Sequence, residues 1–221
     1  MTLFVTDHPQ LKRIRDMSRY KDPSFHSAFL FLFAALVLSG CGDDESSGDA
    51  NTAAATLPAY ERIPDCDGLA ALLGDLVSGL TPADDDGEPG RYQEDGRYGV
   101  NCTWLTPRVR NDNAFEMVKG GSLTVGITVD PRDSSDEKTL RDLGMVYDDA
   151  RVEALGGYVV DMGGKLDPAA QLGMVGPQVV VGHVNISFAA GGLYLQKVEE
   201  LRNVTNDRVI EAAVTLHRSL R

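Results

Sequence analysis

One apolar segment decides which part of this chain can enter a folded domain. Thirteen residues, Ala28–Gly40, are apolar or small and follow a basic region, Lys12–Lys21. The run is too short to span a bilayer as a helix, which takes about 20 residues. A basic region followed by a short apolar region and small residues is typical of a secretory signal peptide. We therefore expect residues 1–40 to be absent from the mature protein.

Cys41 stands directly after this apolar run, in the sequence Leu38-Ser39-Gly40-Cys41. The four residues resemble the lipobox of bacterial lipoproteins, in which the cysteine thiol is acylated with diacylglycerol and the preceding peptide is removed. The resemblance implies that Cys41 becomes the lipidated N-terminus and anchors the chain to the cell membrane on its extracytoplasmic side. An ordinary export signal with a coincidental cysteine is the alternative. Translation from Met17 instead of Met1 would give a shorter leader, and both starts stay open.

The stretch after Cys41 has the composition of a tether. Small and polar residues fill Gly42–Pro58, and Leu57 is its one large apolar side chain. Such a segment buries too little apolar surface to offset the entropy lost on ordering. We therefore predict a disordered acidic tether over residues 41–59 and a single domain over residues 60–221.

The charge balance excludes one class of partner. Five of the 21 Lys and Arg residues and three of the 33 Asp and Glu residues lie in the first 40 positions. The remaining chain therefore carries 16 basic and 30 acidic groups, a formal charge of −14. Tight nucleic-acid binding needs Lys or Arg to displace the counterions of the phosphate backbone. We expect the partner to be a protein or a small molecule and not a nucleic acid.

Apolar periodicity predicts helices at both ends of the domain and strands between them. Leucines at helical spacing predict a first helix over 69–80, capped by Asp65 or Asp67. Further expected elements are strands over 98–104 and 123–129, a helix over 135–143 capped at Ser134, short strands over 151–155 and 158–162, a hairpin of 179–189 with 193–198 around Gly191-Gly192, and a closing helix over 209–220. This order has no regular βαβ alternation, so we predict an α+β fold in which helices cover one face of a mainly antiparallel sheet.

Two cysteines remain once Cys41 is lipidated. Cys66 and Cys102 lie in an exported chain, where oxidation is permitted, and a disulfide between them would join the first helix to the first strand. A metal site and two free thiols are the competing interpretations, although two thiolates without nearby histidines make a poor ligand set. Trp104 shares a strand face with Cys102, so we expect its ring in the core and not in a ligand-stacking site.

An acidic stretch raises the question of calcium. Six carboxylates lie close together in the sequence: Asp84, Asp85, Asp86, Glu88, Glu94 and Asp95. Calcium takes six to eight oxygen ligands, but an EF-hand loop that starts at Asp84 would place Pro89 where glycine is needed. Asp95 would replace the bidentate glutamate of that loop. We expect a solvated acidic loop, with no metal and no cofactor.

The sequence shows no recognisable catalytic set. His183 and His217 are the two histidines after Cys41, and neither has a paired acid and nucleophile in its neighbourhood. Ser122 lacks the following glycine that a nucleophile elbow needs, and Gly163-Gly164-Lys165 lacks the spacing of a P-loop. We therefore predict no catalytic residue and no enzyme activity.

Several of these features together resemble one family. They are the lipobox and tether, a cysteine before a leucine-rich helix, the sequence Cys102-Thr103-Trp104, the glycine turn Leu155-Gly156-Gly157, and a hairpin before a closing helix. The layout resembles the actinobacterial lipoproteins grouped as domain of unknown function thirty-five fifty-eight, over about residues 60–221. The resemblance supports the extracytoplasmic compartment and the fold, and it implies no particular activity.

Three functions are compatible with the sequence. The first is a non-catalytic envelope lipoprotein, a binding or accessory module of unknown ligand. The second is an envelope hydrolase acting on cell-wall or lipid substrates, in which Asp148, Asp149 or Asp161 would do acid and base work. The third is a carrier of an apolar small molecule, which needs a cavity of roughly 300–1,000 Å³. The first is our prediction from sequence.

Overall fold

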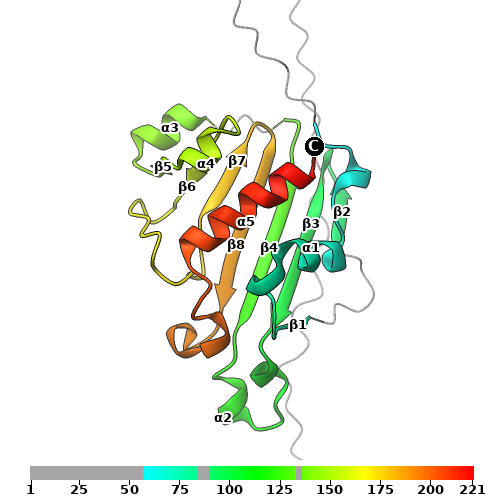
Figure 1. Cartoon of the computed structure of the whole chain (residues 1–221), viewed down its shortest axis with the longest axis vertical. Helices are drawn as coiled ribbons and strands as arrows, with labels where there is room; N and C mark the ends of the chain where they lie inside the picture. The colour runs from blue at the N-terminus through cyan, green and yellow to red at the C-terminus, as the bar shows by residue number, and fades with distance from the viewer. Residues whose placement is uncertain (1–56, 84–89, 133–135) are drawn as a thin grey trace, which may run out of the picture. The chain divides into compact units, whose positions relative to one another are not determined.

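One antiparallel sheet is the framework of the domain (Figure 1). The structure is a computed structural model and describes residues 57–83, 90–132 and 136–221. In these ranges the strands are β1 (Thr81–Pro82), β2 (Arg91–Glu94), β3 (Arg97–Leu105), β4 (Ser122–Val129), β5 (Val146–Tyr147), β6 (Gly157–Val160), β7 (Gln178–Val181) and β8 (Val184–Gly191). Their order is β1-β3-β4-β8-β7-β6-β5, and β2 pairs with the same edge of β3 as β1.

The central strands explain why this sheet forms. Every second residue of β4, from Leu123 to Val129, is completely buried, and the residues between them are half-buried. Such alternation places one apolar row on the core face of the sheet. β3 and β8 pair with β4 along its whole length and show the same alternation. Gly99 permits the close pairing of β3, because a Cβ at this position would lie 1.9 Å from the carbonyl oxygen of Ile127.

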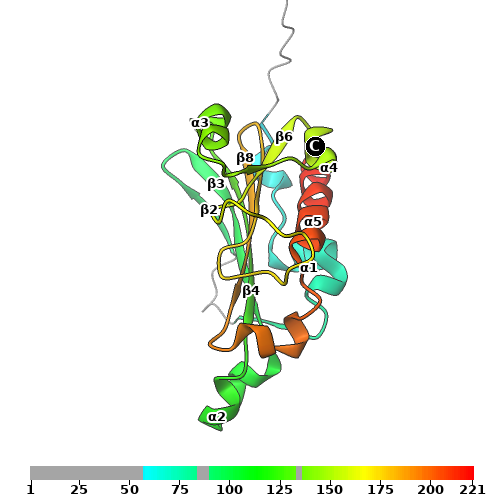
Figure 2. The ribbon, with the colours of Figure 1, turned by 90° about the vertical axis from the view of Figure 1, so that its left-hand side faces the viewer.

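Two helices cover the core face of the sheet. The helices of the described residues are α1 (Cys66–Leu73), α2 (Ala114–Met117), α3 (Glu137–Asp142), α4 (Ala150–Glu153) and α5 (Asn206–Ser219). Short 3₁₀ turns are η1 (Tyr60–Arg62), η2 (Gly74–Leu76), η3 (Pro107–Arg110), η4 (Leu195–Lys197) and η5 (Glu199–Leu201). Figures 1 and 2 show α1 and α5 on the same side of the sheet. The predicted α+β fold is therefore confirmed.

The opposite face of the sheet carries small and polar residues. Thr103 and Thr124 share a hydrogen bond of 2.9 Å across β3 and β4, and the hydroxyl groups of Tyr92 and Thr128 lie 2.6 Å apart. A second, smaller apolar cluster is formed by Tyr158 and Val160 of β6 and Val180 of β7, and Leu140 of α3 packs on it. In the part of the chain that the structure describes, no helix is long and apolar enough to cross a membrane.

The predicted disulfide is confirmed. Cys66, the first residue of α1, is bonded to Cys102 in the middle of β3, and their Cα atoms lie 5.6 Å apart. The bond fixes the start of α1 on the sheet beside Trp104, which is 2% exposed and lies in the core as predicted. Gly90 lets the chain pass over the bond, because a Cβ there would lie 2.4 Å from the Cys66 sulfur.

Helix starts follow the sequence closely, and one helix end does not. The Asp65 carboxylate accepts a hydrogen bond of 2.8 Å from the Gly68 amide and caps α1, as predicted. The helix ends at Leu73 and not at residue 80, because Gly74 takes a left-handed backbone with φ of 54°. Asp136 caps α3, and the predicted cap Ser134 lies outside the described residues.

Two predicted strands are wrong. Residues 151–155 were expected as a strand but Ala150–Glu153 is helix α4, because Asp149 caps the turn by accepting from the Arg151 amide. Residues 193–198 contain the 3₁₀ turn η4, Leu195–Lys197, and no strand. The hairpin instead joins β7 to β8 inside the predicted strand 179–189, and Gly182, with φ of 57°, occupies its two-residue turn.

Candidate functional site

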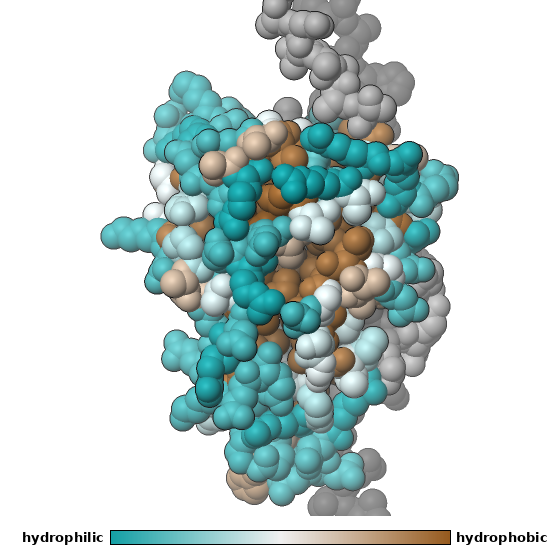
Figure 3. All heavy atoms as spheres, viewed as in Figure 1, coloured by the Kyte–Doolittle hydropathy of each residue, from teal (hydrophilic) through white to brown (hydrophobic). Residues whose placement is uncertain are grey.

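A pocket of about 570 Å³ lies on the helical side of the sheet. It lies where the C-terminal end of α5, the β7–β8 turn and the segment before α1 come together. The residues that line it are Leu57, Pro58, Ala59, Arg62, Leu155, Val181, His183, Val184, His217, Leu220 and Arg221. Seen from this side, apolar residues show between hydrophilic ones (Figure 3). The lining is therefore mainly apolar with a few basic groups.

The wall formed by residues 57–62 is held in place by side chains of the sheet. The Tyr98 hydroxyl donates a hydrogen bond to the Pro58 carbonyl, and the Tyr60 ring packs edge-on against the Tyr98 ring at 6.1 Å. Burial, and to a lesser degree the negative charge of Glu61, raise the pKa of Tyr98, so the hydroxyl keeps the proton that it donates. The Arg91 guanidinium lies 6.0 Å from the centre of the Tyr60 ring. This wall is therefore built from fixed contacts.

The facing wall is the last turn of α5. His217 is 6% exposed, and its Nδ1 is buried without a hydrogen-bond partner. Burial, and then the positive charge of Arg221, lower the pKa of His217 below its ordinary value, so the ring is neutral at pH 7. Arg62 donates a hydrogen bond to the main-chain carbonyl of Arg221 and joins the two walls. A buried polar atom without a partner costs about 1–3 kcal/mol, which singles out His217 in this pocket.

His183 enters the pocket from the β7–β8 turn. Its Nδ1 lies 3.2 Å from the main-chain oxygen of Asp130. Sequence reasoning treated His183 and His217 as unrelated, and the structure brings both to one pocket. The signal that was missed is topological: the hairpin turn and the end of the last helix meet at the same end of the sheet.

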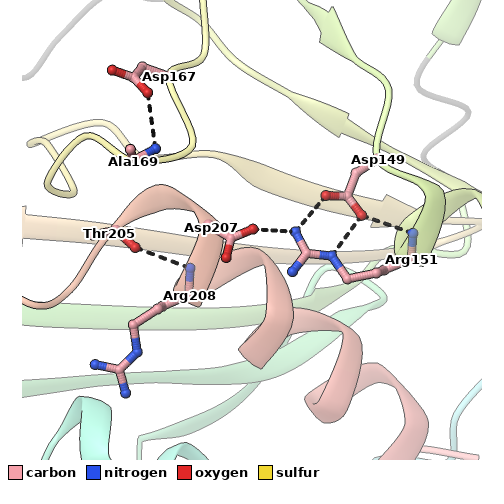
Figure 4. Close-up of polar contacts among 7 residues, drawn as sticks. All are labelled: Asp149, Arg151, Asp167, Ala169, Thr205, Asp207 and Arg208. Carbon is pink, nitrogen blue, oxygen red and sulfur yellow. Dashed lines mark hydrogen bonds and ion pairs between the residues drawn. The ribbon is translucent and has the colours of Figure 1, made fainter.

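An ion-pair cluster fixes α4 against the start of α5 (Figure 4). The Arg151 guanidinium donates to Asp149 at 2.6 and 3.0 Å and to Asp207 at 2.7 Å. The Asp149 side chain is only 10% exposed, and the hydrogen bonds from Arg151 lower its pKa. Thr205 caps α5 by accepting from the Arg208 amide. The cluster therefore fixes the start of α4 against α5, and Leu155 of the pocket follows directly after this short helix.

We expect Arg151→Met to destabilise the domain by about 1–3 kcal/mol, because it leaves the Asp149 carboxylate buried without its partner. The folded-state pKa of Asp149 is lowered, so its stabilisation is present above about pH 4 and is lost as the pH falls through the folded pKa. Urea unfolding of wild type and variant between pH 7 and pH 3 measures both effects. The difference between the two proteins should shrink on acidification.

Arg141→Met is the matched control for that experiment. Arg141 also contacts two carboxylates, Glu137 and Asp148, but all three side chains are largely exposed. Exposed ion pairs contribute little, so this variant should stay close to wild type. An equal loss of stability in both variants would contradict the role assigned to the buried Asp149.

The carboxylates named for the hydrolase alternative are not brought together. Asp148 is exposed and paired with Arg141 at 2.7 Å, and Asp149 is held by Arg151. Asp161 accepts from the Gly163 and Lys165 amides at 3.1 and 2.9 Å. The glycine-lysine loop therefore uses these amides on its own carboxylate, and none of the three carboxylates lines the pocket.

Neither described histidine, His183 or His217, lies near Ser122. Ser122 pairs with Gly191 at one end of the β4–β8 ladder. His183 lies beyond the other end, directly before Val184, which pairs with Val129. A serine and a base must be within hydrogen-bond reach to act together. The described residues also contain no group of three or more His, Cys, Asp or Glu side chains placed to hold a metal ion. Cys41 and the acidic residues 84–88 lie outside the described residues.

Comparisons with known proteins give no family for this chain. A scan against protein-family models found no match, and searches of curated proteins and of solved structures found no significant match. The resemblance to the actinobacterial lipoproteins therefore stays a prediction from sequence.

Proposed function

We propose that this protein is a lipid-anchored extracytoplasmic lipoprotein that binds a small, mainly apolar molecule without chemical conversion. The observation that carries the proposal is the pocket of about 570 Å³ at the end of α5. Ligand sites are typically concave, mainly apolar and roughly 300–1,000 Å³ in volume, with a few polar groups that orient the ligand. The pocket has this size and this composition.

Placement of the pocket on fixed elements also favours binding. Leu220 and Val184 are 1% and 4% exposed and belong to the hydrophobic core, so they give the pocket a packed floor. Its outer wall is tied by Tyr98 to Pro58 and by Arg62 to Arg221. A pre-formed site loses little conformational entropy when a ligand binds. This arrangement supports the carrier among the functions compatible with the sequence.

The lipid anchor is proposed from sequence features alone. The apolar run before Cys41 and the polar tether after it resemble the export region of a bacterial lipoprotein. A hydrolase is the second candidate, but it receives less support because the described pocket residues include no Asp or Glu and no Ser, Thr or Cys nucleophile. We therefore propose a binding or accessory role in the envelope.

Binding of an uncharged apolar dye tests the proposed function. The whole mature chain, with Cys41 replaced by serine and exported behind a cleavable signal, is titrated with N-phenyl-1-naphthylamine while dye fluorescence is followed. We expect saturable binding at one site. Leu155→Trp fills the pocket and should weaken the binding at least tenfold, because Leu155 is one of the lining residues.

Leu143→Trp is the control of the same chemistry. Leu143 is 62% exposed and does not line the pocket, so this variant should bind the dye as wild type does. Absence of saturable binding, or equal loss in both variants, would contradict the pocket as the binding site. Thermal unfolding of each variant checks that the fold is retained.

A further inference from the structure

We propose that the pocket takes a molecule with an apolar tail and an acidic head, either a carboxylate or a phosphate, and that the head lies against Arg62, Arg221 and His217. The inference rests on the proposed binding function and names the ligand class for that site. It follows from how charge and burial are distributed over the lining.

The charged side chains among the described lining residues are all basic. Arg62 and Arg221 line the pocket, and no Asp or Glu is among its described lining residues. This composition is unusual for the chain, because residues 41–221 carry a formal charge of −14. A basic pocket on an acidic molecule favours an anion locally, while the molecule as a whole repels large anionic surfaces. The pocket therefore selects for a small acidic group.

The two arginines have no acidic side-chain partner among the described residues. Neither Arg62 nor Arg221 forms an ion pair with a described carboxylate, whereas Arg151 forms two. The Arg62 guanidinium donates a hydrogen bond to the main-chain oxygen of Arg221, and this bond orients the group. A guanidinium has five donors in a planar fork that matches carboxylate and phosphate oxygens. Within the ranges that the structure describes, most of these donors remain for a ligand.

His217 adds a polar group that the fold leaves without a partner. The ring is 6% exposed, lines the pocket, and its Nδ1 makes no hydrogen bond. A buried polar atom without a partner is costly, and a half-turn of the imidazole about χ2 would exchange the sides on which its nitrogens lie. An oxygen of the ligand head would supply the missing partner. The neutral ring offers a hydrogen bond and adds no further positive charge.

Burial separates the two ends of the ligand. Leu220 and Val184 are buried, Leu155 and Val181 are partly buried, and Arg62 and Arg221 are exposed. The apolar part of the lining therefore lies inward and the guanidinium groups lie at the solvent side. A molecule that enters tail first would bury its apolar part and leave its acidic head at the arginines. This polarity is the reason for an amphiphile and not a wholly apolar ligand.

Competition among amphiphiles with one tail tests the inference. Dodecanoate, dodecyl phosphate, dodecanol and dodecyltrimethylammonium, each below its micelle concentration, are titrated against dye-loaded mature chain. We expect dodecanoate or dodecyl phosphate to bind with an affinity at least tenfold higher than that of dodecanol, as measured by displacement of the dye. The ammonium compound should have the lowest affinity. The tighter of the two acids distinguishes a carboxylate head from a phosphate head.

Charge removal then tests the assigned head site. Arg62→Gln combined with Arg221→Gln should bring the acid-to-alcohol affinity ratio close to one, because both guanidinium groups of the pocket are removed. Arg202→Gln is the control, because Arg202 is exposed, pairs with Glu199 and does not line the pocket. Raising the salt concentration on wild type should weaken the acids and not the alcohol, which gives a readout that does not depend on any variant.

The possible failures are distinguishable. If dodecanol displaces the dye as tightly as the acids, or if the double variant keeps the ratio, the acidic-head inference is wrong while the proposed binding function stands. If neither the dye nor any of the four amphiphiles binds, both are wrong.

Discussion

Replacing both Cys66 and Cys102 with alanine should lower the free energy of unfolding by about 4 kcal/mol. The bond closes a loop with a sequence separation of 36 residues, and opening it restores conformational entropy to the unfolded chain. A domain of ordinary stability has roughly 5–15 kcal/mol, so the loss is a large part of the total. Urea unfolding followed by the fluorescence of buried Trp104 measures the change, and the transition midpoint should fall strongly.

Reduction of the wild-type protein provides the matched comparison. Dithiothreitol should bring the wild-type midpoint close to that of the double variant and leave the double variant unmoved. The single variant Cys102→Ala also breaks the bond, and it removes the same buried sulfur as the double variant, because Cys102 is 2% exposed. Its loss of unfolding free energy should therefore be similar to that of the double variant. A double variant within 1 kcal/mol of oxidised wild type would refute the stabilising role of the bond.

Elements with one buried face were predictable from the sequence. β4 was predicted over 123–129 and runs over Ser122–Val129, because a strict apolar alternation fits a half-buried strand and no helix. The closing helix was predicted over 209–220 and is Asn206–Ser219. In both cases local propensity and the pattern of buried residues favour the same element, so a short stretch of sequence is enough to predict it.

The wrong predictions are short segments whose pattern fits two structures. Val152 and Leu155 are three residues apart, which suits one helical turn as well as the strand that was expected, and the Asp149 cap decides for the helix. In 179–189 three successive valines are followed by an alternation of apolar and polar residues from Val184, and both patterns suit a strand, so they do not reveal the turn at Gly182 that divides the segment. The secondary structure of such segments is determined by their capping residues and by the strands with which they pair.

The candidate site was beyond the reach of sequence reasoning for a different reason. Its lining comes from four places in the chain, around Pro58, Leu155, His183 and His217. No spacing in the sequence links these segments, because they meet only after the sheet order brings β7 and β8 under the end of α5. The disulfide was predictable because only two cysteines were left to pair.

The proposed lipid anchor depends on Cys41. We expect Cys41→Ala to abolish incorporation of a labelled fatty acid into the protein and to prevent formation of the lipidated mature form. The two acyl chains of a diacylglycerol hold a protein firmly, whereas one chain binds only marginally. The loss of the anchor should therefore be close to complete.

Cys66→Ala is the control for this experiment, since it changes a cysteine to the same residue and leaves the lipobox intact. It should keep the label and fractionate with membranes, although it loses the disulfide. Mass measurement distinguishes the forms, because a chain that starts at acylated Cys41 differs from one that retains residues 1–40 or that is cut elsewhere. Label retained in Cys41→Ala would show that acylation occurs at another residue. Label absent from both proteins and from wild type would show that the apolar run is an ordinary export signal, and the pocket would then belong to a protein that is not tethered by lipid.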